Sequence, residues 1–111
     1  MSDMPDKAKL SYRTVDIKRT KRLGDTGSKV FGEYDHSAMI MNIADDIPIE
    51  EQANTFLHEY FHLAIATHRP LEGVADEDAV EERVVSVLAN AVSELFKMNP
   101  EAAKWMVEGM Q

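Results

Sequence analysis

Hydrophobic and polar positions alternate over the first third of the chain, which is the pattern of β-strands. Between residues 9 and 18, apolar side chains occupy positions 10 and 12 and then positions 15 and 17. This spacing contains one phase slip, so it predicts a strand with a bulge or a bend. Two shorter strands are predicted over Val30–Tyr34 and Met39–Ile43, joined by a tight turn in which His36 is expected to be exposed. A loop is expected over Gly24–Ser28.

The hydrophobic spacing changes to a helical period in the second half of the chain. Residues 45–48 (Asp-Asp-Ile-Pro) offer a capping carboxylate and a first-turn proline. A helix of about 18–20 residues is therefore predicted to begin there and to end at Thr67 or His68, because a proline and a glycine follow.

Two further helices are predicted. The first is capped within residues 76–78 and continues to about Lys97, and the second is a short helix over Asn99–Gly109 that would pack Trp105 onto the core. The apolar arc that we expect the longer helix to bury comprises Val80, Val84, Val85, Val87, Leu88, Ala91, Val92 and Leu95.

Strands followed by helices predict an α+β fold, with a small antiparallel sheet and two to three helices packed on one face. The chain has 111 residues and a mass of 12.5 kDa, which fits one domain. We expect a flexible N-terminus over residues 1–8 and a single domain over residues 9–111. Residues 1–9 are polar and no apolar run approaches the length of a membrane span, so a soluble, cytoplasmic protein is predicted.

The charge is unevenly distributed along the chain. Residues 7–30 contain eight basic and two acidic residues, a net charge of +6, whereas residues 31–111 contain four basic and sixteen acidic residues, a net charge of −12. The overall charge of −8 argues against general nucleic-acid binding, and we expect the basic run over residues 18–22 to be a solvated strand end. The opposite charges of the two halves are compatible with a homodimer.

The chain contains no cysteine, so any metal must be held by His, Asp or Glu. Residues 58–62 of the first predicted helix read His-Glu-Tyr-Phe-His, a His-Glu-x-x-His motif. His58 and His62 lie about 40° apart around the helix axis and one turn apart along it, so both imidazoles can reach one ion. Glu59 lies close enough to accept a proton from a zinc-activated water without ligating the metal.

A catalytic zinc site needs a third protein ligand, and the sequence offers three candidates. His68 would point away from His62 if the helix continues, so we interpret it as a histidine at the helix C-terminus. Glu81 has a second explanation, since Asp78-x-x-Glu81 has the spacing of a capping box. We favour Glu82, while Glu81 remains open, and either gives a His-His-Glu set with one position left for water.

These residues resemble those of known zinc enzymes. His58-Glu59-x-x-His62, followed by Glu82, resembles the gluzincin arrangement of zinc metallopeptidases. The compact frame is similar to the minimal zincin core of small phage-encoded and ImmA/IrrE-type metallopeptidases, whose second helix has a Glu-x-x-small-x-x-apolar-Ala pattern that residues 82–89 match in outline. The resemblance spans about residues 9–97 and implies a bacterial or phage protein of the zincin type.

The sequence therefore predicts a zinc-dependent metallopeptidase that acts on a peptide or protein substrate, with His58, His62 and Glu82 as ligands of Zn²⁺ and Glu59 as the general base. An extended peptide would lie along an edge strand, either Val30–Tyr34 or Met39–Ile43. No His or Tyr is recognisable as a group that stabilises the oxyanion.

Two alternatives remain from the sequence. One is a catalytically silent zinc-binding interaction module, for example a regulator of a repressor, and the other is a metal-free helical binding domain in which the histidines are incidental. The first alternative differs from the enzyme in the role of Glu59, and the second differs from both in binding no zinc.

Overall fold

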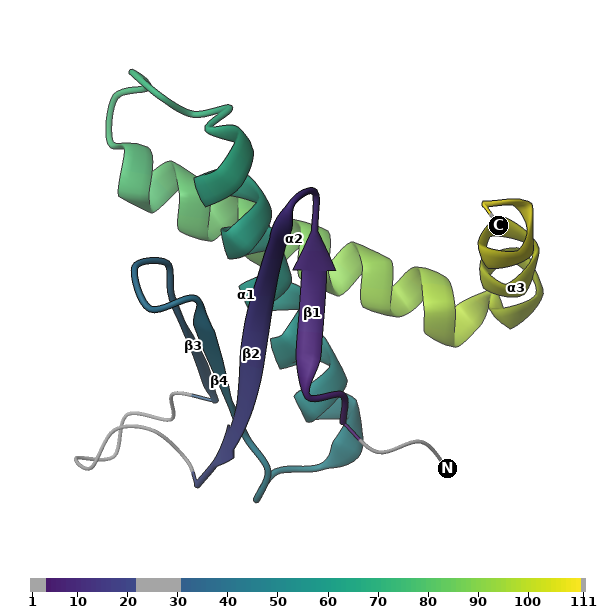
Figure 1. Ribbon diagram of the computed structural model, residues 1–111. Helices are drawn as coiled ribbons and strands as arrows, with labels where there is room; N and C mark the ends of the chain where they lie inside the picture. The colour runs from purple at the N-terminus through teal and green to yellow at the C-terminus, as the bar shows by residue number, and fades with distance from the viewer. Residues whose placement is uncertain (1–3, 22–30, 111) are drawn as a thin grey trace.

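A computed structural model of the protein describes residues 4–21 and 31–110. Four strands are followed by three helices, which confirms the predicted α+β class (Figure 1). The elements are β1 (Lys7–Leu10), β2 (Arg13–Thr20), β3 (Gly32–Asp35), β4 (Ile40–Ala44), α1 (Ile49–His68), α2 (Glu77–Met98) and α3 (Pro100–Gly109). The predicted loop over Gly24–Ser28, together with Arg22 and Val30, lies outside the described residues.

The prediction of one bent strand over residues 9–18 was wrong, because this segment is part of a β-hairpin. β1 pairs with β2 in antiparallel fashion, and the two are joined by a turn at Ser11 and Tyr12. Ser11 has φ = 57°, the left-handed conformation that a tight turn requires. The phase slip in the hydrophobic pattern therefore marks a chain reversal.

The sheet is mixed, whereas an antiparallel sheet was predicted. Its strand order is β1-β2-β4-β3, and the central strands β2 and β4 run parallel, with Ile17 opposite Met41 and Arg19 opposite Ile43. β3 and β4 form the predicted hairpin, with Tyr34 opposite Met41. Because β4 returns to lie between β2 and β3, β3 becomes an edge strand of the described sheet.

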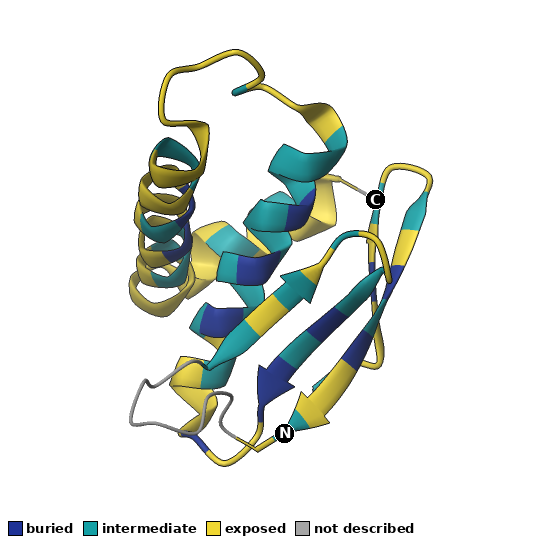
Figure 2. Cartoon of the chain, turned by 90° about the vertical axis from the view of Figure 1, so that its left-hand side faces the viewer, coloured by how far each residue is buried: buried dark blue, intermediate teal, exposed yellow. Residues whose placement is uncertain are grey.

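The molecule has three layers, in the order sheet, α1 and α2. Figure 2 shows α1 between the sheet and α2, and the contacts agree, because α1 touches β1, β3, β4 and α2. α3 contacts the C-terminal end of α2 (Figure 1). Within the described ranges, no helix is long and apolar enough to span a membrane.

The core lies between the sheet and α1. Its buried side chains come from β1, β2, β4 and α1, and Met4, Leu10, Tyr34, Met39, Phe56 and Tyr60 pack against them. The fully buried residues of this cluster are Val15, Met41, Ile43 and Leu63. Tyr60 was expected to belong to the core, and this is confirmed, since its ring packs there while its hydroxyl donates to the carbonyl of Lys9.

α1 has the predicted length but not the predicted start. Pro48 is the N-cap and the helix begins at Ile49, so residues 45–46 lie before the N-cap position that was expected of a carboxylate. The helix ends at His68, as predicted, because Arg69 adopts a left-handed conformation with φ = 54° and its N–H donates to the carbonyl of Ile65.

α2 and α3 bury less apolar surface than their sequences suggest. In α2 only Val85 and Ala89 are buried, and Val87, which was expected in the buried arc, is 62% exposed. The reason is that α2 packs against α1 along one side, so Val84, Val87 and Leu88 are exposed, whereas Val80, Val92 and Leu95 are half-buried. Trp105 of α3 is 74% exposed, which contradicts its predicted packing onto the core.

Candidate metal centre

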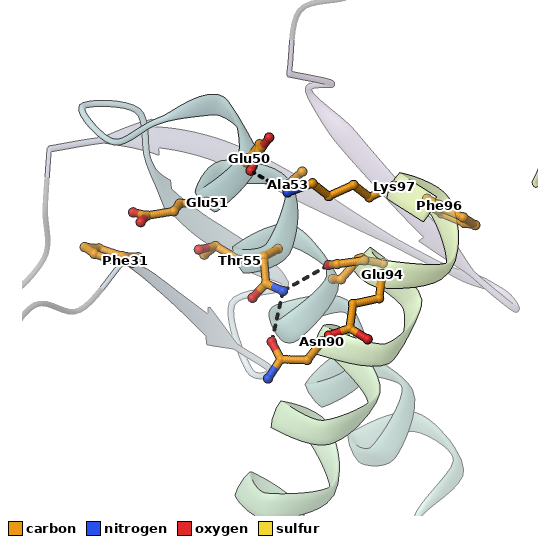
Figure 3. A pocket seen from close by; sticks show the side chains of 12 residues that line it. Phe31, Glu50, Glu51, Ala53, Thr55, Asn90, Glu94, Phe96 and Lys97 are labelled. Carbon is orange, nitrogen blue, oxygen red and sulfur yellow. Dashed lines mark hydrogen bonds and ion pairs between the residues drawn. The ribbon is translucent and has the colours of Figure 1, made fainter. Parts of the chain in front are cut away.

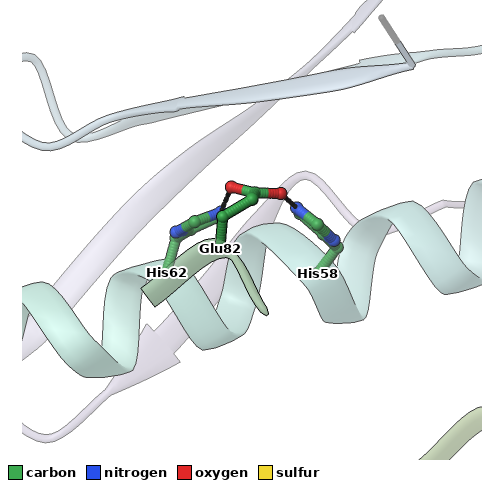
Figure 4. Close-up of side chains that lie close together, drawn as sticks. All are labelled: His58, His62 and Glu82. Atoms are coloured by element: carbon green, nitrogen blue, oxygen red, sulfur yellow. Dashed lines mark ion pairs between the residues drawn. The ribbon is translucent and has the colours of Figure 1, made fainter. Parts of the chain in front are cut away.

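His58 and His62 project from the same side of α1, as their four-residue spacing requires. Their ring centroids lie 5.0 Å apart. Glu82 projects toward them from the beginning of α2, and Figure 4 shows its carboxylate lying between the two imidazoles. The long contact between α1 and α2 therefore brings the three predicted ligands together.

The distances in this group are those of direct polar contact. Nε2 of His58 lies 2.8 Å from Oε1 of Glu82, and Nε2 of His62 lies 3.0 Å from Oε2 of the same carboxylate. One ligand atom from each residue can be chosen so that all three lie within 4.8 Å of one another. Two imidazole nitrogens and one carboxylate oxygen form a donor set that fits a transition-metal ion such as zinc.

Glu81 contacts the candidate ligand His62. Its Oε2 lies 2.7 Å from Nδ1 of His62, on the ring nitrogen that does not face Glu82. No side-chain hydrogen bond caps α2, so the capping box predicted for Asp78 and Glu81 is not formed. Glu81 is thus placed to orient His62, in the way that carboxylates support histidine ligands in metal sites.

Glu59 lies beside the histidines but faces the sheet, and it is only 6% exposed. Burial raises the pKa of its carboxyl from 4.5 to about 7. His62 and a hydrogen bond from the backbone N–H of Tyr34 act in the opposite direction, and the charges of Glu82 and Glu33 raise the pKa further.

β3 approaches Glu59 closely because residue 32 is glycine. A Cβ atom at Gly32 would collide with Cγ2 of Thr55 and would lie 3.2 Å from Oε2 of Glu59 and from the carbonyl oxygen of Asn42. The absence of a side chain therefore lets the edge strand pack directly against the part of α1 that contains Thr55 and Glu59.

Sequence reasoning missed two residues of this site, Tyr34 and His36. Both line the same cavity as His58, Glu59 and His62. The hydroxyl of Tyr34 lies 2.6 Å from Nδ1 of His36, so the expectation of a simply exposed His36 was wrong. Their position depends on β3 being the strand next to α1, which the local sequence does not specify.

The site cavity has a volume of about 420 Å³. A larger cavity of about 710 Å³ lies between the first turns of α1 and the second half of α2 (Figure 3). Asn54 donates there to Ser93 Oγ over 2.9 Å and to Asn90 Oδ1 over 3.2 Å, which ties the two helices together. The group of candidate metal ligands found among the described residues belongs to the smaller cavity.

His68, which was rejected as a third ligand from the sequence, is exposed in the last turn of α1 and does not belong to this group. The centre thus combines the converging ligand atoms of His58, His62 and Glu82 with two further carboxyl groups. Glu81 contacts His62, and the buried Glu59 lies beside the histidines. Such an arrangement can bind a divalent cation and hold a proton next to it. Comparisons of the chain with models of protein families, with curated proteins and with solved structures give no match.

Proposed function

We propose that the protein is a zinc-dependent metallopeptidase in which His58, His62 and Glu82 hold the ion. One observation supports this most strongly: ligand atoms of these residues converge within 4.8 Å on the wall of a cavity that Glu59 also lines. A set of three protein ligands leaves a coordination position for water or substrate, as in catalytic zinc sites.

A bound zinc ion would polarise the scissile carbonyl group and lower the pKa of a water molecule. Glu59 would accept the proton of the attacking water at its carboxylate and pass it to the leaving nitrogen. Glu81 would keep His62 oriented through its contact with Nδ1.

The substrate would be an extended peptide paired with β3. Of the two candidate edge strands, β4 is paired on both sides, with β2 and with β3, whereas β3 is at the end of the described sheet. The backbone of β3 lies next to Glu59, as the hydrogen bond from Tyr34 indicates. A peptide added to this edge would pass the site with its carbonyl groups in reach of the metal ligands.

The experiment that tests the metal assignment is zinc analysis of the tag-free protein and of two variants. We expect about one zinc per chain in the wild type, none in His58→Ala, and wild-type content in the control His68→Ala. Wild-type protein that stays free of zinc after reconstitution would refute the proposal.

A catalytically silent zinc-binding interaction module is the second candidate. The exposed apolar side chains of α2 and α3, which include Val87 and Trp105, favour it, because such surfaces often bind other proteins. The two candidates differ at Glu59. If the protein is an enzyme, Glu59→Gln retains zinc and loses turnover of a mixed peptide library, whereas a silent module shows no turnover before or after this change.

A further inference from the structure

Tyr34 and His36 form a hydrogen-bonded pair on the wall of the site cavity that the β3–β4 hairpin provides. The phenol oxygen lies 2.6 Å from Nδ1 of His36, and the two rings meet edge to face with centroids 5.6 Å apart. Both residues line the cavity of the metal centre, yet neither belongs to the group of converging ligand atoms.

The hydrogen bond between the two side chains favours one tautomer of His36. Tyr34 has one hydroxyl proton and two neighbouring acceptors, Nδ1 of His36 at 2.6 Å and the sulfur of Met39 at 3.7 Å. A thioether is a weak acceptor, so the proton is directed to Nδ1. Burial raises the pKa of Tyr34, and the phenol therefore keeps its proton at neutral pH. A neutral His36 then bears its own hydrogen on Nε2.

The turn that presents His36 is held independently of the cavity. Oδ1 of Asp35 accepts hydrogen bonds from the backbone N–H of Ser37 (3.0 Å), from its hydroxyl (2.8 Å) and from the backbone N–H of Ala38 (3.1 Å). These bonds lower the pKa of Asp35, so its charged form is favoured. His36 thus lies between a fixed turn and the phenol of Tyr34, as a pre-organised donor must.

We propose that His36 donates a hydrogen bond from Nε2 to the oxygen that becomes negative during peptide hydrolysis, and that Tyr34 is the positioning residue that sets its tautomer. The inference rests on the proposed peptidase function and supplies the stabilising group that the sequence did not reveal. His36 keeps its proton throughout, because the interaction requires donation of a hydrogen bond and no proton transfer.

The tautomer can be measured without activity and without metal. Nitrogen-15 NMR of the metal-free protein at pH 8 should show His36 with hydrogen on Nε2, and Tyr34→Phe should shift this population toward Nδ1. A wild-type His36 with hydrogen on Nδ1 would overturn the inference, since Nε2 would then be an acceptor.

Steady-state kinetics of the zinc-loaded protein test the catalytic role. We expect His36→Ala to lower kcat on the order of 100-fold with KM changed little, which is the loss caused by removing one oxyanion donor. His36→Gln should recover part of kcat, and His68→Ala should match the wild type. Equal kcat in wild type and His36→Ala, both with full zinc content, would overturn the inference and leave the proposed function standing.

If the zinc-loaded wild type hydrolyses no peptide, the proposed function is refuted, but the role of His36 as a hydrogen-bond donor can still be tested. Inorganic phosphate is then the probe. His36→Ala should then weaken phosphate binding to the zinc-loaded protein by about 10-fold, which corresponds to the loss of one hydrogen bond to an anion. Undiminished binding in this variant, or no binding by the wild type, would overturn the role of His36 as a donor.

Discussion

Oε2 of Glu81 lies 2.7 Å from Nδ1 of His62, on the side of the ring opposite the nitrogen that faces Glu82. Neighbouring glutamates in α2 thus contact the same imidazole in different ways. Glu82 meets the nitrogens that converge on the candidate centre, while Glu81 can only act through His62. The converging ligand atoms therefore include Glu82, whereas Glu81 contacts the far nitrogen of His62.

The first prediction separates these two roles. Glu81→Ala should weaken zinc binding by about 10–100-fold, the usual effect of losing the partner of a histidine ligand. Glu82→Ala should weaken it further, because a ligand is removed. Affinities are to be measured by competition with a chromophoric chelator, with Glu77→Ala at the exposed start of α2 as the control. A larger loss in Glu81→Ala than in Glu82→Ala would reverse the assignment.

The second prediction concerns metal removal. A ligand that binds only the folded state at 100 times its Kd stabilises it by about 2.7 kcal/mol. For a chain of this size, zinc should therefore raise Tm by roughly 10 °C, and a chelator should reverse the rise. Differential scanning fluorimetry of wild type and His62→Ala measures this. A zinc-dependent rise of equal size in His62→Ala would show that the ion binds elsewhere.

The third prediction follows from the buried carboxyl of Glu59, whose pKa is raised from 4.5 to about 7 in the metal-free protein. Between these values the folded protein binds more protons than the unfolded chain, so stability falls as pH rises through this window. The full effect is on the order of 3 kcal/mol. Glu59→Gln should remove this pH dependence.

Urea denaturation with a chelator present, at pH 5 and pH 8, measures that effect. Glu101→Gln on exposed α3 is a matched control that removes one carboxylate without changing the core. If wild type and Glu59→Gln lose the same stability between the two pH values, Glu59 is not the group that titrates.

The fourth prediction tests the close approach of β3 to α1. Gly32→Ala places a methyl group against Cγ2 of Thr55, so it should destabilise the protein by about 1–3 kcal/mol. Thr55→Ser removes that methyl group, and the double variant should recover part of the loss. Chemical denaturation of the single and double variants measures the coupling. Additive effects would indicate that Gly32 matters for another reason.

The parts of the molecule that the sequence predicts best are set by local signals. The length of α1 is predicted because Pro48 precedes the helix and Pro70 and Gly73 follow its last turn. The convergence of His58 and His62 follows directly from helical spacing, and Glu82 joins them because α2 packs along α1.

The parts that could not be predicted depend on contacts between distant segments. The sequences of β2 and β4 contain no signal of their parallel pairing. This pairing makes β3 the edge strand beside α1. The burial of Glu59 and the position of His36 in the cavity both follow from that arrangement. The outward valines of α2 were misjudged for a similar reason, since helix periodicity identifies apolar faces but not their partners.

The fifth prediction contrasts two valines of α2 that lie two positions apart. Val85 is fully buried against α1, whereas Val87 is 62% exposed. Val85→Ala should destabilise the protein by about 2 kcal/mol, because apolar surface is lost and a cavity is left. Val87→Ala should change the free energy of unfolding by less than about 0.5 kcal/mol, since it removes little buried area. Both are measured by urea denaturation at low and high protein concentration. A loss in Val87→Ala that grows with protein concentration would contradict the exposure of this face in solution, because a second copy of the chain would then be covering it.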